Sequence, residues 1–161
     1  MTKNEAKVLT VSDGVVSGTR EDRSGAALAE LLSGNGFEVV ERAVCPDEID
    51  LVSTALRALA SKFSGLVVTT GGTGFAPRDI TPEATMLVIE RGAPGLAEAM
   101  RTASPLGRLT RGTAGTIGNC LVLNVPGSPN GAVECVRAVL DVLPHALGLL
   151  TGAHDPHPLA D

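Results

Sequence analysis

Residues 69–85 combine glycines, hydroxyl side chains, an arginine and an aspartate in an order that suits the binding of phosphate. Glycines allow the backbone to approach a ligand closely and to adopt positive φ angles. Successive N–H groups and hydroxyls of such a loop form a concavity that phosphate oxygens can occupy. Asp79 places a carboxylate beside this anion cradle, an arrangement that calls for a bridging cation. The stretch therefore predicts a magnesium-dependent phosphate site.

Two common phosphate-binding motifs do not account for this loop. No Gly-Lys-Ser/Thr follows at the spacing of a Walker A motif, and Pro77 occupies the third glycine position of a dinucleotide-binding fingerprint. A tight glycine-rich turn with a solvated Asp79 is the plain structural alternative. The surroundings favour the phosphate site, because an apolar run precedes the loop and Thr81 and Pro82 begin a capped helix after it.

Alternating strands and helices must position this loop. Apolar runs predict strands over residues 6–12, 37–44, 65–70 and 120–125. Apolar spacing and capping signals predict helices, the last of them bent at Pro144, over residues 24–34, 49–63, 82–91, 95–102 and 132–150. A weak apolar pattern indicates a loop with a short irregular hairpin over residues 103–119.

Strands that are apolar throughout and alternate with helices are typical of an α/β fold whose parallel sheet is covered on both faces. We expect one domain over residues 1–152 and a loose tail over 153–161. In such sheets, ligands bind in the crevice beyond the carboxyl ends of the strands. The loops at that edge hold most of the glycines and spare carboxylates, and they span residues 12–23, 45–48, 69–79 and 126–131.

The composition excludes several classes of function. The 161-residue chain has a net charge of −5 and no basic cluster, so no nucleic-acid partner is expected. No apolar run approaches the roughly 20 residues of a membrane span, and residues 1–12 lack the layout of a signal peptide. Cys45, Cys120 and Cys135 form no Cys-x-x-Cys pair, which favours buried free thiols in a reducing, cytoplasmic compartment.

Motifs outside the glycine loop match the same known family as the loop itself. They are Leu-Thr-Val-Ser-Asp at 9–13, Asp-Arg-Ser-Gly at 22–25, Pro-Asp-Glu at 46–48, Pro-Gly-Leu at 94–96, Leu-Asn-Val-Pro-Gly-Ser-Pro at 123–129 and His-Ala-Leu at 145–147. With these motifs, the chain resembles the molybdopterin adenylyltransferases of molybdenum cofactor biosynthesis. That Mog/MoaB-type fold is also the G domain of plant and animal cofactor-assembly proteins. The resemblance covers residues 6–152 and is most specific over 71–85.

This resemblance implies a three-layer α/β/α, molybdopterin-binding-type fold that is usually trimeric, although the sequence does not separate a trimer from a hexamer. It also implies transfer of AMP from ATP to the terminal phosphate of molybdopterin, with Mg²⁺ as the cofactor and pyrophosphate as the leaving group. Because that phosphate is already anionic, the reaction needs positioning and charge neutralisation rather than a general base. A molybdenum insertase is an implied partner, and molybdenum and tungsten pathways are not distinguished.

Asp79 and Asp47 are the expected catalytic residues and Mg²⁺ ligands, because each follows a strand end at the same edge of the sheet. A helix-terminal charge is the alternative reading of Asp79, and ordinary capping is the alternative for Asp47. The other candidates for contact with the pterin or the nucleotide are Ser12, Asp13, Gly71, Gly72, Thr73, Gly74, Thr110, Pro126, Gly127 and Ser128.

Several of these assignments have alternatives. Asp13 also fits the start of a turn, and the Pro-Gly-Ser-Pro stretch at 126–129 also fits a turn ahead of a helix. Residues 109–111 read Leu-Thr-Arg where the family pattern has Leu-Ser-Arg, and Arg78 is expected to pair with phosphate or with Glu83. Three rival functions remain: a protein that binds the pterin without turning over ATP, a nucleotide-pyrophosphate hydrolase, and a structural oligomer.

Overall fold

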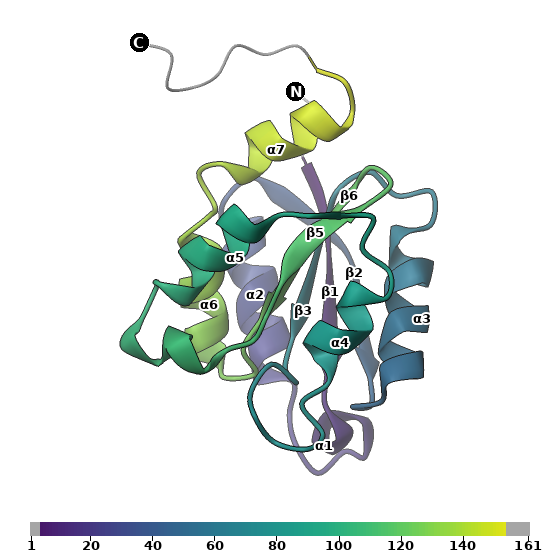
Figure 1. Cartoon of the computed structure of the whole chain (residues 1–161), viewed down its shortest axis with the longest axis vertical. Coiled ribbons are helices and arrows are strands. Elements are labelled where there is room, and N and C mark those ends of the chain that lie inside the picture. The colour runs from purple at the N-terminus through teal and green to yellow at the C-terminus, as the bar shows by residue number, and fades with distance from the viewer. Residues whose placement is uncertain (1–3, 154–161) are drawn as a thin grey trace.

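A single six-stranded sheet forms the centre of the computed structural model, which describes residues 4–153 (Figure 1). The strands are β1 (Asn4–Val11), β2 (Phe37–Cys45), β3 (Leu66–Thr70), β4 (Arg91–Gly92), β5 (Ala114–Ile117) and β6 (Cys120–Val125). Their order in the sheet is β2-β1-β3-β6-β5-β4. The first four strands of that order run parallel to one another. Strand β5 runs antiparallel to β6, and β4 runs antiparallel to β5. The predicted mostly parallel sheet is therefore confirmed.

Helices cover both faces of this sheet (Figure 1). The helices of the described chain are α1 (Asp13–Val16), α2 (Arg23–Ser33), α3 (Ile49–Ala60), α4 (Thr81–Met86), α5 (Pro94–Arg101), α6 (Pro129–Arg137) and α7 (Leu143–Leu150), with a 3-10 helix η1 at Pro105–Leu109. One face carries α2, α5, α6 and α7, and the other carries α3 and α4, which gives three layers. Within residues 4–153, no helix combines the length and the apolar character that crossing a membrane requires.

Side chains of the parallel strands alternate between two separate apolar cores. On β1, Val8 belongs to the core under α2, α5, α6 and α7, whereas Leu9 belongs to the core under α3 and α4. Leu66 and Val67 on β3 divide in the same way. Because successive side chains of a strand point to opposite faces, a strand buried on both faces is apolar at nearly every position. This explains the continuous apolar runs in the sequence.

The two edges of the sheet differ in length. β2 forms one edge and exposes the charged residues Glu38, Glu41 and Arg42. It also contains one extra residue, Val40, opposite the step from Ala6 to Lys7 on β1, so its pairing is interrupted by a bulge. β4 forms the other edge and has only two residues. Neither edge therefore presents a long regular strand.

The prediction of one bent helix over residues 132–150 is wrong. Helix α6 ends at Arg137, turns follow, and α7 begins at Leu143 with Pro144 in its first turn. Proline is favoured at the start of a helix, because the N–H group that it lacks would have no helical partner there. Pro144 therefore begins a new helix instead of bending a long one.

The helix predicted over residues 82–91 is also shorter in the structure. Helix α4 ends at Met86, and the Glu90 N–H donates to the carbonyl of Thr116 at 2.8 Å, which pairs the chain with β5. The loop and hairpin predicted over 103–119 correspond to η1 and to the antiparallel pair of β5 and β6. The domain boundary at residue 152 stays a prediction, and the tail beyond Ala153 lies outside the described residues.

The cysteine thiols are buried and free, as predicted. Burial raises the pKa of the Cys45 and Cys135 thiols to about 11 and that of the Cys120 thiol to about 12. A pKa that is raised on folding means that these thiols stabilise the fold fully below their ordinary pKa of 9.0. That contribution is lost as the pH rises through about 11 and 12.

We therefore expect the native protein to react very slowly with a thiol reagent such as dithionitrobenzoate at mildly alkaline pH. After unfolding in guanidinium, all the thiols should react. The absorbance of the released thionitrobenzoate measures the rate of labelling in the native and in the unfolded protein. Rapid labelling of the native protein would contradict the buried, protonated state of these side chains.

Candidate functional site

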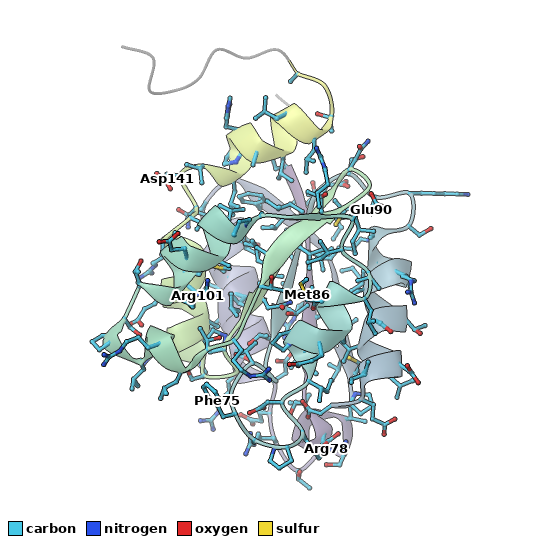
Figure 2. All side chains as sticks on the ribbon, in the orientation of Figure 1. Phe75, Arg78, Met86, Glu90, Arg101 and Asp141 are labelled. Carbon is cyan, nitrogen blue, oxygen red and sulfur yellow. The ribbon has the colours of Figure 1, made fainter. Side chains whose placement is uncertain are left out.

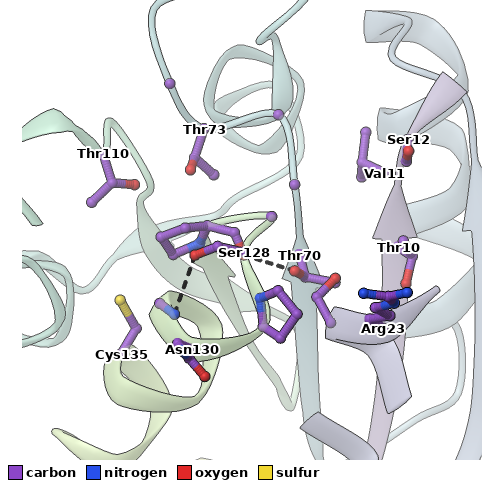
Figure 3. A pocket seen from close by; sticks show the side chains of 18 of the residues that line it. Thr10, Val11, Ser12, Arg23, Thr70, Thr73, Thr110, Ser128, Asn130 and Cys135 are labelled. Carbon is purple, nitrogen blue, oxygen red and sulfur yellow. Dashed lines mark hydrogen bonds between the residues drawn. The ribbon is translucent and has the colours of Figure 1, made fainter. Parts of the chain in front are cut away.

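A cavity of about 1320 Å³ opens where β1, β3 and β6 end (Figure 3). The segments that follow these strands line it, together with residues of η1 and of the loop before α2. The structure thus brings the loops predicted at one sheet edge into contact with a single space. The sequence-predicted residues that line it are Ser12, Asp47, Gly71, Gly72, Thr73, Gly74, Asp79, Thr110, Pro126, Gly127 and Ser128.

The glycine loop is held at both ends by hydrogen bonds to the sheet and to α4. The Gly71 N–H donates to the Val125 carbonyl at 3.1 Å, and the Thr81 hydroxyl donates to the Gly71 carbonyl at 2.9 Å. Between these anchors, the N–H groups of Gly72, Thr73 and Gly74 donate to no acceptor within residues 4–153. Three successive unused N–H groups beside a cavity are the donors that an anion cradle requires.

Asp47 and Asp79 lie against the same loop. A Cβ atom added at Gly72 would lie 3.2 Å from Oδ1 of Asp47, and one added at Gly74 would lie 2.8 Å from Oδ2 of Asp79. Backbone N–H groups orient both carboxylates, because Oδ2 of Asp79 accepts from Ala76 at 2.8 Å and Oδ2 of Asp47 accepts from Asp13 at 2.8 Å. Both acids therefore face the space that the glycines leave open.

Burial and neighbouring charges both act on the pKa of the Asp47 carboxyl. Burial raises the pKa of the Asp47 carboxyl, and the nearby charges of Asp13 and Asp79 raise it further, against the lowering effect of the Asp13 N–H and of Arg78. A cation bound between Asp47 and Asp79 would reduce the electrostatic repulsion between the two carboxylates. Within the described chain, no cluster of three or more histidine, cysteine or acidic side chains could hold a metal ion. Two carboxylates nevertheless fit Mg²⁺, which binds oxygen ligands and keeps several of its waters.

Asp13 does not line the cavity. Its Oδ1 accepts from the Asp47 N–H at 3.0 Å, and its Oδ2 accepts from Nε of Arg78 at 2.6 Å. The hydrogen bond from Arg78 is the main cause that lowers the pKa of the Asp13 carboxyl. Of the two partners expected for Arg78, phosphate and Glu83, the second is wrong, because Arg78 is engaged by Asp13 and Glu83 is engaged by Arg111.

Arg111 clamps the glycine loop from the outside. Its Nε donates to the Gly74 carbonyl at 2.7 Å, and its Nη2 donates to the Asp79 carbonyl at 2.7 Å. Its guanidinium also pairs with Glu83, which lowers the pKa of that carboxyl, and lies 5.9 Å from the centroid of the Phe75 ring. Figure 2 shows Phe75 and Arg78 at the lower end of the molecule, beyond the sheet. Arg111 thus holds the loop without lining the cavity.

Replacing Arg111 with alanine should loosen the loop, because the carbonyls of Gly74 and Asp79 would lose their donors. We expect faster hydrogen exchange in the peptide that contains residues 72–79, measured by mass spectrometry on the native protein. Arg108→Ala is the matched control, since the hydrogen bond of that exposed side chain goes to the Pro105 carbonyl of its own 3-10 helix. Unchanged exchange in Arg111→Ala would contradict the clamp.

The hydroxyls predicted to contact ligand also cap helices. Oγ of Ser12 accepts from the Val15 N–H at 3.2 Å at the start of α1, and Oγ of Ser128 accepts from the Gly131 N–H at 3.2 Å at the start of α6 (Figure 3). The turn ahead of a helix, the alternative for residues 126–129, is therefore present. It still lines the cavity, and a Cβ at Gly127 would lie 3.3 Å from Cα of Gly71, so the two glycine-containing loops touch.

Arg20 and Arg23 were not among the sequence candidates. They are the cations that line the cavity in the described part of the chain, and the acids that line it are Glu21, Asp47, Asp79 and Glu134. The Asp-Arg-Ser-Gly stretch at 22–25 was a signal for Arg23, whereas nothing in the sequence singled out Arg20. His145 lies on α7 and does not line the cavity.

Comparison with known proteins agrees with the fold. A family model described as a probable molybdopterin binding domain matches residues 7–145. The molybdopterin adenylyltransferase of Helicobacter pylori strain J99 is 40% identical over 152 residues, which cover 90% of this chain and 86% of that protein. The crystal structure of the molybdopterin biosynthesis enzyme MoaB from Thermus thermophilus superposes with a TM-score of 0.88 and 47% identity, over 92% of this chain and 97% of that one.

The same domain also occurs within a longer relative. The molybdenum cofactor synthesis protein cinnamon of Drosophila melanogaster is 39% identical over 151 residues, which cover 89% of this chain and 25% of that protein. The cavity, the paired aspartates and these similarities lead to one assignment. The chain belongs to the molybdopterin-binding domain family and has the fold of the MoaB and Mog proteins.

Proposed function

We propose that this protein is a molybdopterin adenylyltransferase, which transfers AMP from ATP to the terminal phosphate of molybdopterin and releases pyrophosphate. The name and 40% identity of the Helicobacter pylori relative support this function. The structural observation that carries it is the pair Asp47 and Asp79 beside a loop with three unused N–H donors. That combination suits a reaction between two polyanions, where positioning and charge neutralisation are the main requirements.

The side chains need only position the two phosphate-bearing substrates for this reaction. An oxygen of the pterin phosphate forms a bond to the α-phosphorus of ATP, and the bond from that phosphorus to pyrophosphate breaks with its electron pair leaving on pyrophosphate. No proton needs to be removed from an anionic phosphate, which agrees with a cavity that no histidine lines within residues 4–153. The N–H groups of Gly72, Thr73 and Gly74, residues that line the cavity, would donate to phosphate oxygens.

Asp47 and Asp79 would hold Mg²⁺, which when bound neutralises phosphate charge and aligns the reacting groups. The lining of the cavity makes such neutralisation necessary, because its acids outnumber Arg20 and Arg23. Arg20 lies in the loop before α2 and Arg23 is the first residue of that helix, and both side chains line the cavity. We assign them to the outer phosphates of the substrates, where long flexible cations can follow an incoming polyanion.

Three further features belong to this proposal. A homotrimer and a cytoplasmic location follow from the family resemblance, and the buried free thiols suit a reducing compartment. A molybdenum insertase is the expected partner, which is supported by the presence of the same domain within a longer cofactor synthesis protein.

The test is adenylyl transfer by the purified protein with molybdopterin, ATP and Mg²⁺. Because the chain has no Trp or Tyr, pterin fluorescence can be followed with little protein background. We expect pyrophosphate and adenylyl-molybdopterin in equal amounts, and neither product when EDTA replaces free Mg²⁺. If the protein binds the pterin and releases no pyrophosphate at any Mg²⁺ concentration, the adenylyltransferase assignment fails and a pterin-binding role replaces it.

A further inference from the structure

Asp13 and Arg78 form an ion-pair bridge that is joined by hydrogen bonds to Asp47, one of the two aspartates of the cavity. Arg78 binds Asp13 in a bidentate manner, through Nε to Oδ2 at 2.6 Å and through Nη2 to Oδ1 at 3.1 Å. Asp13 and Asp47 also exchange hydrogen bonds, because the N–H group of each donates to the carboxylate of the other, at 2.8 and 3.0 Å. The bonds therefore run from Arg78 through Asp13 to Asp47.

The bridge joins segments that are distant in the sequence. Asp13 begins α1 after β1, Asp47 follows β2, and Arg78 ends the glycine loop that follows β3. Arg78 is also the immediate neighbour of Asp79, so the position of its guanidinium constrains the backbone that carries the second carboxylate. One ion pair thus connects the backbone of Asp79 with the carboxylate of Asp47.

The geometry points to Asp13 and Arg78 as positioning residues that fix the separation and orientation of the Asp47 and Asp79 carboxylates. Neither residue lines the cavity, so both act through the aspartates and not on the substrate. This inference rests on the proposed function of the site, because it assigns the bridge to the metal that the two aspartates would hold. Groups that orient metal ligands in this way commonly affect metal affinity or activity by about 10–100-fold.

The bridge contributes little to the stability of the fold. The Arg78 side chain is 59% exposed and the Asp13 side chain is 44% exposed. Exposed ion pairs add little to the free energy of unfolding, because water already solvates both charges. Removal of the bridge should therefore leave thermal unfolding close to that of the wild type while catalysis falls, a separation that a merely structural role does not produce.

A double-mutant cycle tests whether the two residues act as one unit. We expect Arg78→Ala and Asp13→Ala each to lower kcat by about 10–100-fold with little change in the KM for molybdopterin. In the Asp13→Ala background, Arg78→Ala should add nothing. Arg78→Lys should recover only part of the rate, since lysine cannot make the bidentate contact. If the two single-variant losses of kcat multiply in the double variant, the bridge is overturned, because Arg78 would then act on the substrate directly.

Glu41→Ala is the matched control. It removes one partner of another partly exposed ion pair, formed with Lys7 at 3.1 Å and joining β1 to β2 away from the cavity. We expect wild-type kcat and KM from this variant. A loss in Glu41→Ala as large as that in Arg78→Ala would overturn the assignment, because any disturbed ion pair would then have the same effect.

Metal binding provides a readout that does not depend on turnover. The probe is Mn²⁺ with α,β-methylene-ATP, which cannot release pyrophosphate, and bound Mn²⁺ is measured by the relaxation rate of water protons. We expect Arg78→Ala and Asp13→Ala to weaken Mn²⁺ binding about tenfold relative to the wild type. Binding as tight as that of the wild type, or no protein-bound Mn²⁺ in the wild type, would overturn the inference.

The turnover assay and the Mn²⁺-binding assay together distinguish failure of the bridge from failure of the proposed function. If the wild type binds Mn²⁺ with the nucleotide but releases no pyrophosphate from ATP, the adenylyltransferase function fails. The bridge still stands in that case if its variants bind Mn²⁺ more weakly. If the wild type turns over and its bridge variants bind Mn²⁺ and turn over equally well, the function stands and the bridge fails.

Discussion

Replacement of Asp79 by asparagine is expected to lower the rate of adenylyl transfer by about 1000-fold and to leave the fold intact. Asparagine keeps a side-chain oxygen for the Ala76 N–H, which donates to Asp79 at 2.8 Å, so the loop should retain its shape. The negative charge is lost, and with it one of the two carboxylates that would hold Mg²⁺ against the transferring phosphate. Single-turnover measurement of pyrophosphate release isolates this effect from substrate binding.

Asp141→Asn is the matched control for that variant. Asp141 is an exposed residue in the turns between α6 and α7, far from the cavity edge of the sheet (Figure 2). The Asp141→Asn variant should transfer the adenylyl group at the wild-type rate. Wild-type activity in Asp79→Asn would show that the reaction does not use this carboxylate. A joint loss of activity and of thermal stability would instead assign Asp79 to the fold.

The second large effect is expected from Gly71→Ala. Gly71 has a φ angle of +99°, and a Cβ atom there would lie 2.3 Å from the carbonyl oxygen of Val11 at the end of β1. Because a backbone atom of a central strand cannot move aside without disturbing the sheet, both the conformational strain and the clash remain. We expect the free energy of unfolding to fall by about 3 kcal/mol or more. The thermal midpoint would then fall by about 6–12 °C.

Gly36→Ala separates the two causes. Gly36 also has a positive φ, +85°, but a Cβ atom there would meet nothing within 4 Å. Gly36→Ala should lower the free energy of unfolding by about 1 kcal/mol, the cost of the positive φ angle alone. Thermal unfolding followed by circular dichroism compares the two variants. Equal losses in Gly71→Ala and Gly36→Ala would show that the contact with Val11 plays no part.

The sequence predicted those features that depend on local patterns. Continuous apolar runs indicate strands buried on both faces, and β1, β3 and β6 have that burial. The position of Asp47 and Asp79 just after strand ends predicted their meeting at one edge, since parallel strands end together. The structure brings both acids to the cavity, while their roles in catalysis and metal binding stay predictions.

The features that could not be predicted depend on long-range pairing. Arg111 lies in a stretch with a weak apolar pattern, and its partners Gly74 and Glu83 are separated from it by 37 and 28 positions. Arg78 and Glu83 are near neighbours in the sequence, yet Arg78 reaches Asp13, 65 positions away. Side-chain spacing along a chain cannot indicate such partners, because the fold decides which loops meet.

The edges of the sheet bear on how copies of this protein meet. An open sheet with a long regular edge strand invites strand addition from another chain and, from there, aggregation. Here the charged side chains and the Val40 bulge of β2 interrupt one edge, and the two-residue β4 shortens the other. The protein is thereby protected from open-ended growth through its sheet at high concentration. The homotrimer proposed above would then form through other surfaces of the molecule.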